Sequence, residues 1–164
     1  MAKMTATRRP PTLVLGSASP RRRRILRDMN VRFRVRVPEV AEISHAIDPL
    51  RTCAENAERK NAWCREREPE AVVLSADTVV VCDGECIEKP RSLEEAAVFL
   101  RRLGGRRHEV YTAVVFGGPG PLAARAEVTR SAVWMKPLND DDIQRYFERV
   151  NPMDKAGAYS IDSH

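Results

Sequence analysis

Aromatic residues are scarce in this 164-residue chain, at 5% of the sequence, and long apolar runs are missing. No run approaches the roughly 20 apolar residues that a membrane-spanning helix needs, and residues 1–11 lack the apolar core of a secretory signal. We therefore expect a flexible polar segment over 1–11, no membrane partner and a cytoplasmic location. No aromatic residue interleaves with the basic run 21–24, which argues against a base-stacking platform and a nucleic-acid partner.

Several common motifs are absent as well. The chain has no Walker A phosphate loop, no G-x-G-x-x-G dinucleotide fingerprint and no G-x-S-x-G serine-hydrolase elbow. Its four cysteines lack the paired two-residue spacing of a zinc ribbon, and reduced, partly buried thiols are expected. Cys82 and Cys86 flank the turn residues Asp83-Gly84, so these two cysteines are expected to lie opposite each other on a hairpin.

Charge is abundant and slightly unbalanced, with 28 lysines and arginines against 23 acidic residues. The resulting net charge of +5 favours anionic partners, and on charge alone nucleotides, nucleic acids and acidic membranes all remain open.

Apolar periodicity predicts one α/β domain over 12–164, with a mixed sheet flanked by helices. The run 71–81 is long and rich in β-branched residues, as in a central strand. Strict alternation over 31–37 predicts a half-buried strand with one solvated face. Further strands are expected over 12–15, up to 87, over 109–116 and over 122–135, and helices from 20 onward, over 50–67, over 92–103 and after Asn139.

A cluster of arginines lies at the start of the first predicted helix. Ser19 suits the N-cap and Pro20 the first helical position, so Arg21 and Arg22 fall in the first turn. Cations are disfavoured there by the helix macrodipole, unless an anion lies in front of the helix. A polyphosphate site is our interpretation, and a solvated basic face or a nucleic-acid patch is the alternative.

Two further charges interrupt apolar patterns. Asp77 lies in the middle of the predicted central strand, where an ionised carboxylate needs a partner. It is either a structural acceptor of hydrogen bonds, or a metal ligand or general base. Lys60 projects from the apolar stripe of its helix, where a lysine often extends toward solvent instead.

Taken together, these charges fit phosphoryl chemistry. Arg21, Arg22, Lys60 and Lys89 supply positive charge, while Asp77 and Glu42 supply carboxylates for a divalent cation. Magnesium commonly binds through one or two carboxylates plus substrate phosphates. Basic residues on phosphate oxygens and acidic residues on a metal are what phosphoryl transfer requires.

The chain resembles the Maf family of nucleoside triphosphate pyrophosphatases over nearly its whole length from Leu13. The similarity is carried by the set Leu15-Gly16-Ser17-Ala18-Ser19-Pro20-Arg21-Arg22, Glu42, Lys60, Ser75-Ala76-Asp77-Thr78-Val79-Val80, Asp83-Gly84, Glu88-Lys89-Pro90, Leu103-Gly104-Gly105, His108, Tyr111-Thr112 and Asp154-Lys155-Ala156-Gly157-Ala158-Tyr159.

The resemblance implies a twisted mixed sheet in two lobes with a cleft between them, usually as a homodimer. It implies hydrolysis of a nucleoside triphosphate between the α- and β-phosphates with Mg²⁺ or Mn²⁺, with Asp77 as proton acceptor. Metal ligation is implied for Glu42 and Asp77, and substrate binding for Ser17, Ser19, Arg21, Arg22, Lys60, Thr78, Lys89 and Asp162.

Within the family, the motifs Ser-Pro-Arg-Arg, Ala-Asp-Thr and Glu-Lys-Pro are similar to the branch that acts on dTTP and UTP. Two features depart from that pattern. Asp162 stands where that branch usually has Gln, and an ionised Asp only accepts hydrogen bonds. The family normally continues beyond His164, so the chain is expected to lack its C-terminal segment. The alternative function is a catalytically impaired, basic module that binds nucleotides or nucleic acid.

Overall fold

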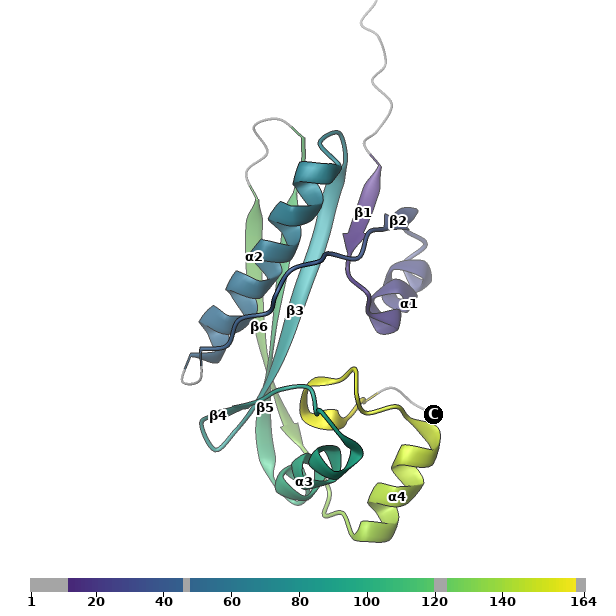
Figure 1. Cartoon of the computed structure of the whole chain (residues 1–164), viewed down its shortest axis with the longest axis vertical. Helices are drawn as coiled ribbons and strands as arrows, with labels where there is room; N and C mark the ends of the chain where they lie inside the picture. Colours follow the sequence, from purple (N-terminus) through teal and green to yellow (C-terminus); the bar gives the residue numbers. More distant parts are fainter. Residues whose placement is uncertain (1–11, 46–47, 120–123, 162–164) are drawn as a thin grey trace, which may run out of the picture.

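The computed structural model describes residues 12–45, 48–119 and 124–161 (Figure 1). The segment 1–11, expected to be flexible, and the expected substrate-binding residue Asp162 lie outside these ranges.

Within these ranges the chain forms six strands and four α-helices, interspersed along the sequence, which confirm the predicted α/β class. The strands are β1 (Leu13–Gly16), β2 (Phe33–Val35), β3 (Val72–Cys82), β4 (Glu85–Ile87), β5 (Arg107–Gly117) and β6 (Arg125–Trp134). The helices are α1 (Pro20–Asp28), α2 (Pro49–Arg67), α3 (Leu93–Leu103) and α4 (Asp140–Arg149), followed by the short 3₁₀ turn η1 (Ala156–Ala158). Among the described residues, no helix has both the length and the apolar character needed to cross a membrane.

The sheet is mixed and has the strand order β2-β1-β3-β5-β6. β1 runs parallel to β2 and β3, whereas β5 is antiparallel to β3 and β6. β5 pairs with β3 from Val73 to Val81, so β1 and β4 must share the other edge of β3. On that edge β1 pairs with 72–75 and β4 with 80–82. The intervening residues Ala76–Val79, called the open stretch of β3 below, pair with no described strand on this side.

Two lobes are arranged along the length of β3, as expected (Figure 1). The first lobe contains β1, β2, α1 and α2, and the second contains β4, α3, α4 and η1. Each lobe buries apolar side chains of its own. The first lobe buries Val14, Cys64, Ala71 and Val73 in one cluster and Cys53, Ala57, Ala113 and Val115 in another. The second lobe buries Ala96, Ala97, Leu100, Ile143 and Ala158 in one cluster and Val80, Cys82, Ile87 and Leu103 in another.

The strand predicted over 31–37 is shorter than expected. Only Phe33–Val35 forms a strand, because its sole neighbour β1 is itself four residues long and offers three paired positions. Val35 and Val37 are 41% and 47% exposed, so the alternating pattern does not mark a half-buried face here.

The expected position of Cys82 opposite Cys86 is wrong. The turn residues are Asp83 and Gly84, so Cys82 pairs with Glu85, and Cys86 lies opposite Val81. All four cysteines are free, as expected, and only Cys86 is not fully buried.

Candidate active site

Asp77 lies at the centre of β3, in the open stretch, and is 7% exposed. Successive side chains of a strand point to opposite faces, so Ser75 and Asp77 both face α2. The Ser75 hydroxyl donates to the Ala57 carbonyl of α2 at 2.8 Å, which fixes the helix against this face of the strand. The buried carboxylate of Asp77 is therefore presented directly to α2.

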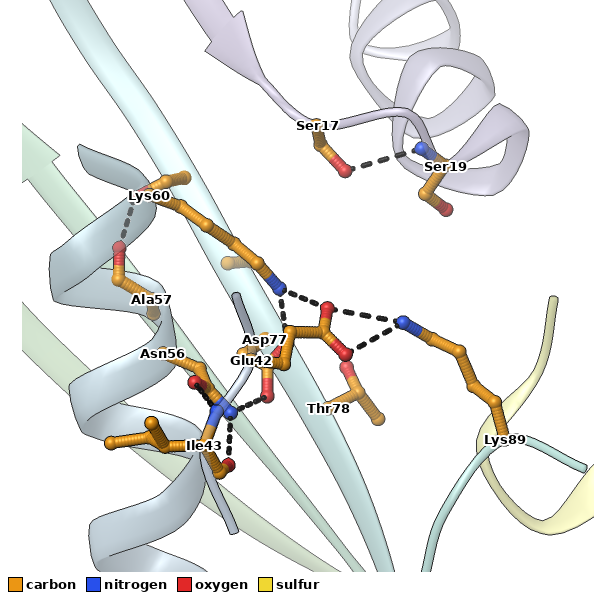
Figure 2. A network of polar contacts seen from close by, with 12 residues as sticks. Ser17, Ser19, Glu42, Ile43, Asn56, Ala57, Lys60, Asp77, Thr78 and Lys89 are labelled. Carbon is orange, nitrogen blue, oxygen red and sulfur yellow. Dashed lines mark hydrogen bonds and ion pairs between the residues drawn. The ribbon is translucent and has the colours of Figure 1, made fainter. Parts of the chain in front are cut away.

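Lys60 of α2 supplies the counter-charge. Its Nζ donates to Asp77 Oδ1 at 2.6 Å and to Glu42 Oε1 at 2.7 Å (Figure 2). The side chains of Lys60 and Asp77 are 11% and 10% exposed, so this ion pair is largely removed from water. Each side chain therefore supplies the partner that the other needs, because an unpaired charge at this depth costs several kcal/mol.

Glu42 lies in the loop between β2 and α2 and joins Lys60 to a residue of the second lobe. Lys89, which follows β4, donates to both carboxylate oxygens of Glu42 at 2.9 and 3.0 Å (Figure 2). Burial alone would raise the pKa of Glu42. Hydrogen bonds and charges from Lys60 and Lys89 outweigh it and lower the pKa to about 2. Glu42 is thus ionised at neutral pH, although its side chain is 43% exposed.

Arg22 forms a second network on the other face of β3. Ser19 caps α1 by accepting from the Arg22 amide, and this directs the Arg22 side chain toward the open stretch. The guanidinium donates to Ser17 Oγ at 3.0 Å, to the Ala76 carbonyl at 2.7 Å and to Thr78 Oγ1 at 3.2 Å. Burial lowers the pKa of Arg22, and the nearby carboxylates of Asp77 and Glu42 oppose that shift.

Arg21 reaches the second lobe. Its Nη2 donates to the Ser160 hydroxyl at 2.9 Å. Ser160 is held in turn, because its amide donates to the Tyr146 hydroxyl at 2.8 Å. The neighbouring Tyr159 hydroxyl bonds with His108 Nε2 at 2.7 Å. The first turn of α1 therefore contacts the C-terminal segment of the second lobe.

The structure brings together most of the residues predicted for the site. Asp77, Lys60, Glu42 and Lys89 form one ion-pair network, and Arg22, Ser17 and Thr78 form a second one. Ser19 joins the second network, since its amide donates to the Ser17 hydroxyl at 3.2 Å.

Sequence reasoning assigned no site role to Asn56, Ser160 or Thr112. Asn56 contacts Asp77, Ser160 contacts Arg21, and the Thr112 hydroxyl lies 3.2 Å from that of Thr78. Asn56 was detectable in principle, because it is polar and lies next to the apolar stripe of α2. The other two contacts depend on tertiary structure.

Glu42 and Asp77 are the carboxylates available to a metal ion at this site. Described residues contain no group of three or more His, Cys, Asp and Glu placed to hold a metal ion. Glu42 and Asp77 nevertheless each place an oxygen within 2.7 Å of the same Lys60 nitrogen, so their carboxylates are close neighbours. Two oxygen ligands from the protein, completed by phosphate oxygens and water, are the donor set that Mg²⁺ prefers. The residues present fit such an ion.

A pocket of about 590 Å³ lies elsewhere, in the second lobe. Its lining comes from α3, α4 and the segments beside α4, and it includes Ser160 and Tyr159 but neither Asp77 nor Lys60. It is therefore separate from the ion-pair network on β3.

Comparisons with known proteins agree with the resemblance seen in the sequence. The family model described as Maf-like protein matches residues 12–164. A dTTP/UTP pyrophosphatase of Bacillus velezensis is 41% identical over 150 residues, covering 91% of this chain and 78% of that protein. A dTTP/UTP pyrophosphatase of Symbiobacterium thermophilum is 45% identical over 151 residues, covering 91% of this chain and 76% of that protein. Among solved structures, the Ham1 protein of Staphylococcus aureus gives a TM-score of 0.49 at 16% identity, covering 75% of this chain and 71% of that one.

Proposed function

This chain belongs to the Maf-like protein family, and on that premise we propose that it hydrolyses dTTP, UTP or related nucleotides to the monophosphate and pyrophosphate. One structural observation carries the proposal. On the edge opposite β5, the open stretch of β3 has no neighbouring strand within the described ranges, so a ligand at this edge can reach Asp77 and Lys60 on one face and Arg22 and Thr78 on the other. The carboxylate can accept a proton from the attacking water, while the lysine and the arginine beside it can stabilise the charge of a polyphosphate.

Asp77 is the proton acceptor in this scheme. Water adds to the phosphorus, its proton passes to Asp77, the α–β anhydride bond breaks and pyrophosphate leaves. Lys60 donates to this carboxylate at 2.6 Å and fixes its orientation for the proton transfer. Its second oxygen is oriented by the Asn56 amide at 3.4 Å.

The basic residues stabilise the negative charge that develops on the phosphates. Lys89 is 48% exposed and held by Glu42, so its ammonium can turn toward a bound triphosphate without being buried further. Arg22 is anchored to three acceptors of the protein and contributes charge from a fixed position. Arg21 faces the second lobe and can bind phosphate oxygens from that side.

Glu42 and Asp77 are the residues that would hold Mg²⁺ or Mn²⁺. When bound, the ion would neutralise phosphate charge and polarise the reacting phosphoryl group. Ser17, Ser19 and Thr78 border Arg22 and would contact substrate oxygens. Thr78, together with Asp162, would influence the choice of base.

The activity can be tested with a panel of nucleoside triphosphates in the presence of Mg²⁺ or Mn²⁺. Pyrophosphate and orthophosphate are measured separately, because their ratio reports which anhydride bond is cut. Release of pyrophosphate from dTTP and UTP, faster than from purine nucleotides, is expected. Release of orthophosphate alone, or of neither product from any nucleotide, refutes the proposal.

Asp77→Asn tests the proposed base. We expect turnover to be abolished while the fold is kept, since Lys60 retains Glu42 as a partner. Asp83→Asn is the matched control, because Asp83 follows the same strand, is 59% exposed and pairs with Arg106 away from the open stretch. Pyrophosphate release by Asp77→Asn at the rate of Asp83→Asn removes Asp77 from the chemical step.

A homodimer in the cytoplasm completes the proposal. The family resemblance supports the dimer, and four free cysteines together with a nucleotide substrate support the compartment. Sedimentation of the purified chain and imaging of a tagged copy test these two points.

A further inference from the structure

Asn56 carries a buried side-chain amide, and its contacts extend beyond the one that orients Asp77. It is 4% exposed and lies one helical turn before Lys60 on α2, so both side chains project from the same face of the helix. Through that face it contacts both segments that carry the carboxylates of the site.

The strongest of these contacts involve the loop that bears Glu42. Asn56 Oδ1 accepts from the Ile43 amide at 2.9 Å, and Asn56 Nδ2 donates to the Ile43 carbonyl at 2.9 Å (Figure 2). One side chain therefore satisfies both backbone groups of the residue directly after Glu42. The contact with Asp77 Oδ2 is longer, at 3.4 Å, and Asp77 is already fixed by its strand.

Lys60 and Lys89 hold the carboxylate of Glu42, but the backbone that carries this side chain needs support of its own. The side chain of Glu42 is 43% exposed and belongs to a loop without regular structure. The next anchor along that loop is the His45 amide, which donates to Thr52 Oγ1 at 2.9 Å. The two bonds at Ile43 thus anchor the backbone from which Glu42 reaches Lys60 and Lys89.

We propose that Asn56 is a positioning residue, which holds Glu42 where it can bind the metal complex of the nucleotide. The proposal rests on the proposed function. Asp77 and Lys60 are carried by β3 and α2 and stay in place without Asn56. Loss of the Asn56 amide therefore weakens binding of metal and substrate more than it slows the chemical step.

Asn56→Leu keeps the size of the side chain and removes its hydrogen bonds. We expect KM for the Mn²⁺–dTTP complex to rise by about 10–100-fold, the range typical of groups that orient a metal ligand, with kcat changed much less. Mn²⁺ binding measured by calorimetry without nucleotide should weaken in parallel. The Ile43 amide should exchange its hydrogen faster. Asn56→Ser, whose hydroxyl is too short to bridge Ile43, should act in the same direction and serves if the leucine variant does not fold.

Asn61→Leu is the matched control. Asn61 is a second buried asparagine of α2, 1% exposed, and its amide donates to the Val73 and Val115 carbonyls away from the Glu42 loop. We expect this substitution to lower stability and to leave KM and Mn²⁺ affinity unchanged. An equal rise of KM in Asn61→Leu overturns the positioning role.

Combining Asn56→Leu with Glu42→Gln decides whether Asn56 acts through Glu42. If Asn56 acts through Glu42, Asn56→Leu adds little to the KM of Glu42→Gln, whereas a full additional rise overturns the proposal. If the wild-type protein releases no pyrophosphate, the proposed function fails but the positioning role is still decided. Faster exchange at Ile43 with weaker Mn²⁺ binding in Asn56→Leu supports it, and unchanged values overturn it.

Discussion

Replacing Lys60 by methionine should be among the most damaging single substitutions in the first lobe. Methionine keeps much of the apolar stem of the side chain and removes the ammonium that lies 2.6 Å from Asp77 and 2.7 Å from Glu42. Asp77, with its side chain 10% exposed, is then left with one long hydrogen bond from Asn56. Breaking a buried pair in this way costs about 3–5 kcal/mol, because an uncompensated charge remains.

Lys89→Met is the control, since Lys89 also pairs with Glu42. Both side chains of that pair are more than 40% exposed, and an exposed ion pair contributes about 0–1 kcal/mol. The two lysines therefore share a partner but differ in burial, and the expected difference between the variants is about 2–5 kcal/mol.

Urea denaturation at pH 7, followed by circular dichroism, measures both free energies of unfolding. Adding Asp77→Asn to Lys60→Met should recover part of the loss, because the double variant no longer buries a bare carboxylate. The reasoning is refuted if Lys60→Met lies within about 1 kcal/mol of the wild type, or if Lys89→Met costs as much.

Three further outcomes are expected. Arg22→Lys loses the fork that joins the Ala76 carbonyl to Thr78, which should lower the free energy of unfolding by about 1.5–3 kcal/mol in the same urea assay; an unchanged midpoint contradicts the cross-link. Burial lowers the pKa of His108 in the folded protein, so the unfolded chain takes up a proton at this residue at a higher pH than the folded chain does. The melting temperature should therefore fall as the pH drops below about 6.5. A His108→Gln variant should lose that part of the pH dependence, and an identical pH profile contradicts it. Gly117→Ala places a Cβ 2.8 Å from Asn61 Oδ1, and the overlap should cost about 1–3 kcal/mol, which thermal unfolding would measure; a stable variant shows that the amide can move.

The buried ion pair was predictable from the sequence in part. Asp77 and Lys60 each interrupt an apolar pattern, which indicates that both are buried and that each needs a partner. That they are partners of each other depends on how α2 crosses β3. No periodicity encodes this crossing, because it follows from the order of strands in the sheet.

Other parts of the site could not be derived from sequence patterns. The arginines of α1 look alike in the sequence, yet the structure anchors Arg22 on β3 and directs Arg21 to Ser160. Asn56 was overlooked because asparagine is usually a surface residue. Its hydrogen-bond partner Ile43 lies in a loop 13 positions earlier in the sequence. The length of β2 followed from its neighbour β1 and not from its own alternation.

Each described segment of backbone that crosses between the two lobes is a β-strand. Along the described ranges, the backbone moves from one lobe to the other on β3, returns on β5 and crosses again on β6, and these strands are hydrogen-bonded to one another. A pivot on a flexible linker is therefore not available to this part of the molecule, and the angle between the lobes follows the twist of three paired strands. Residues that change that twist would alter how far apart Arg21 and Lys89 are held, even from positions that no substrate touches.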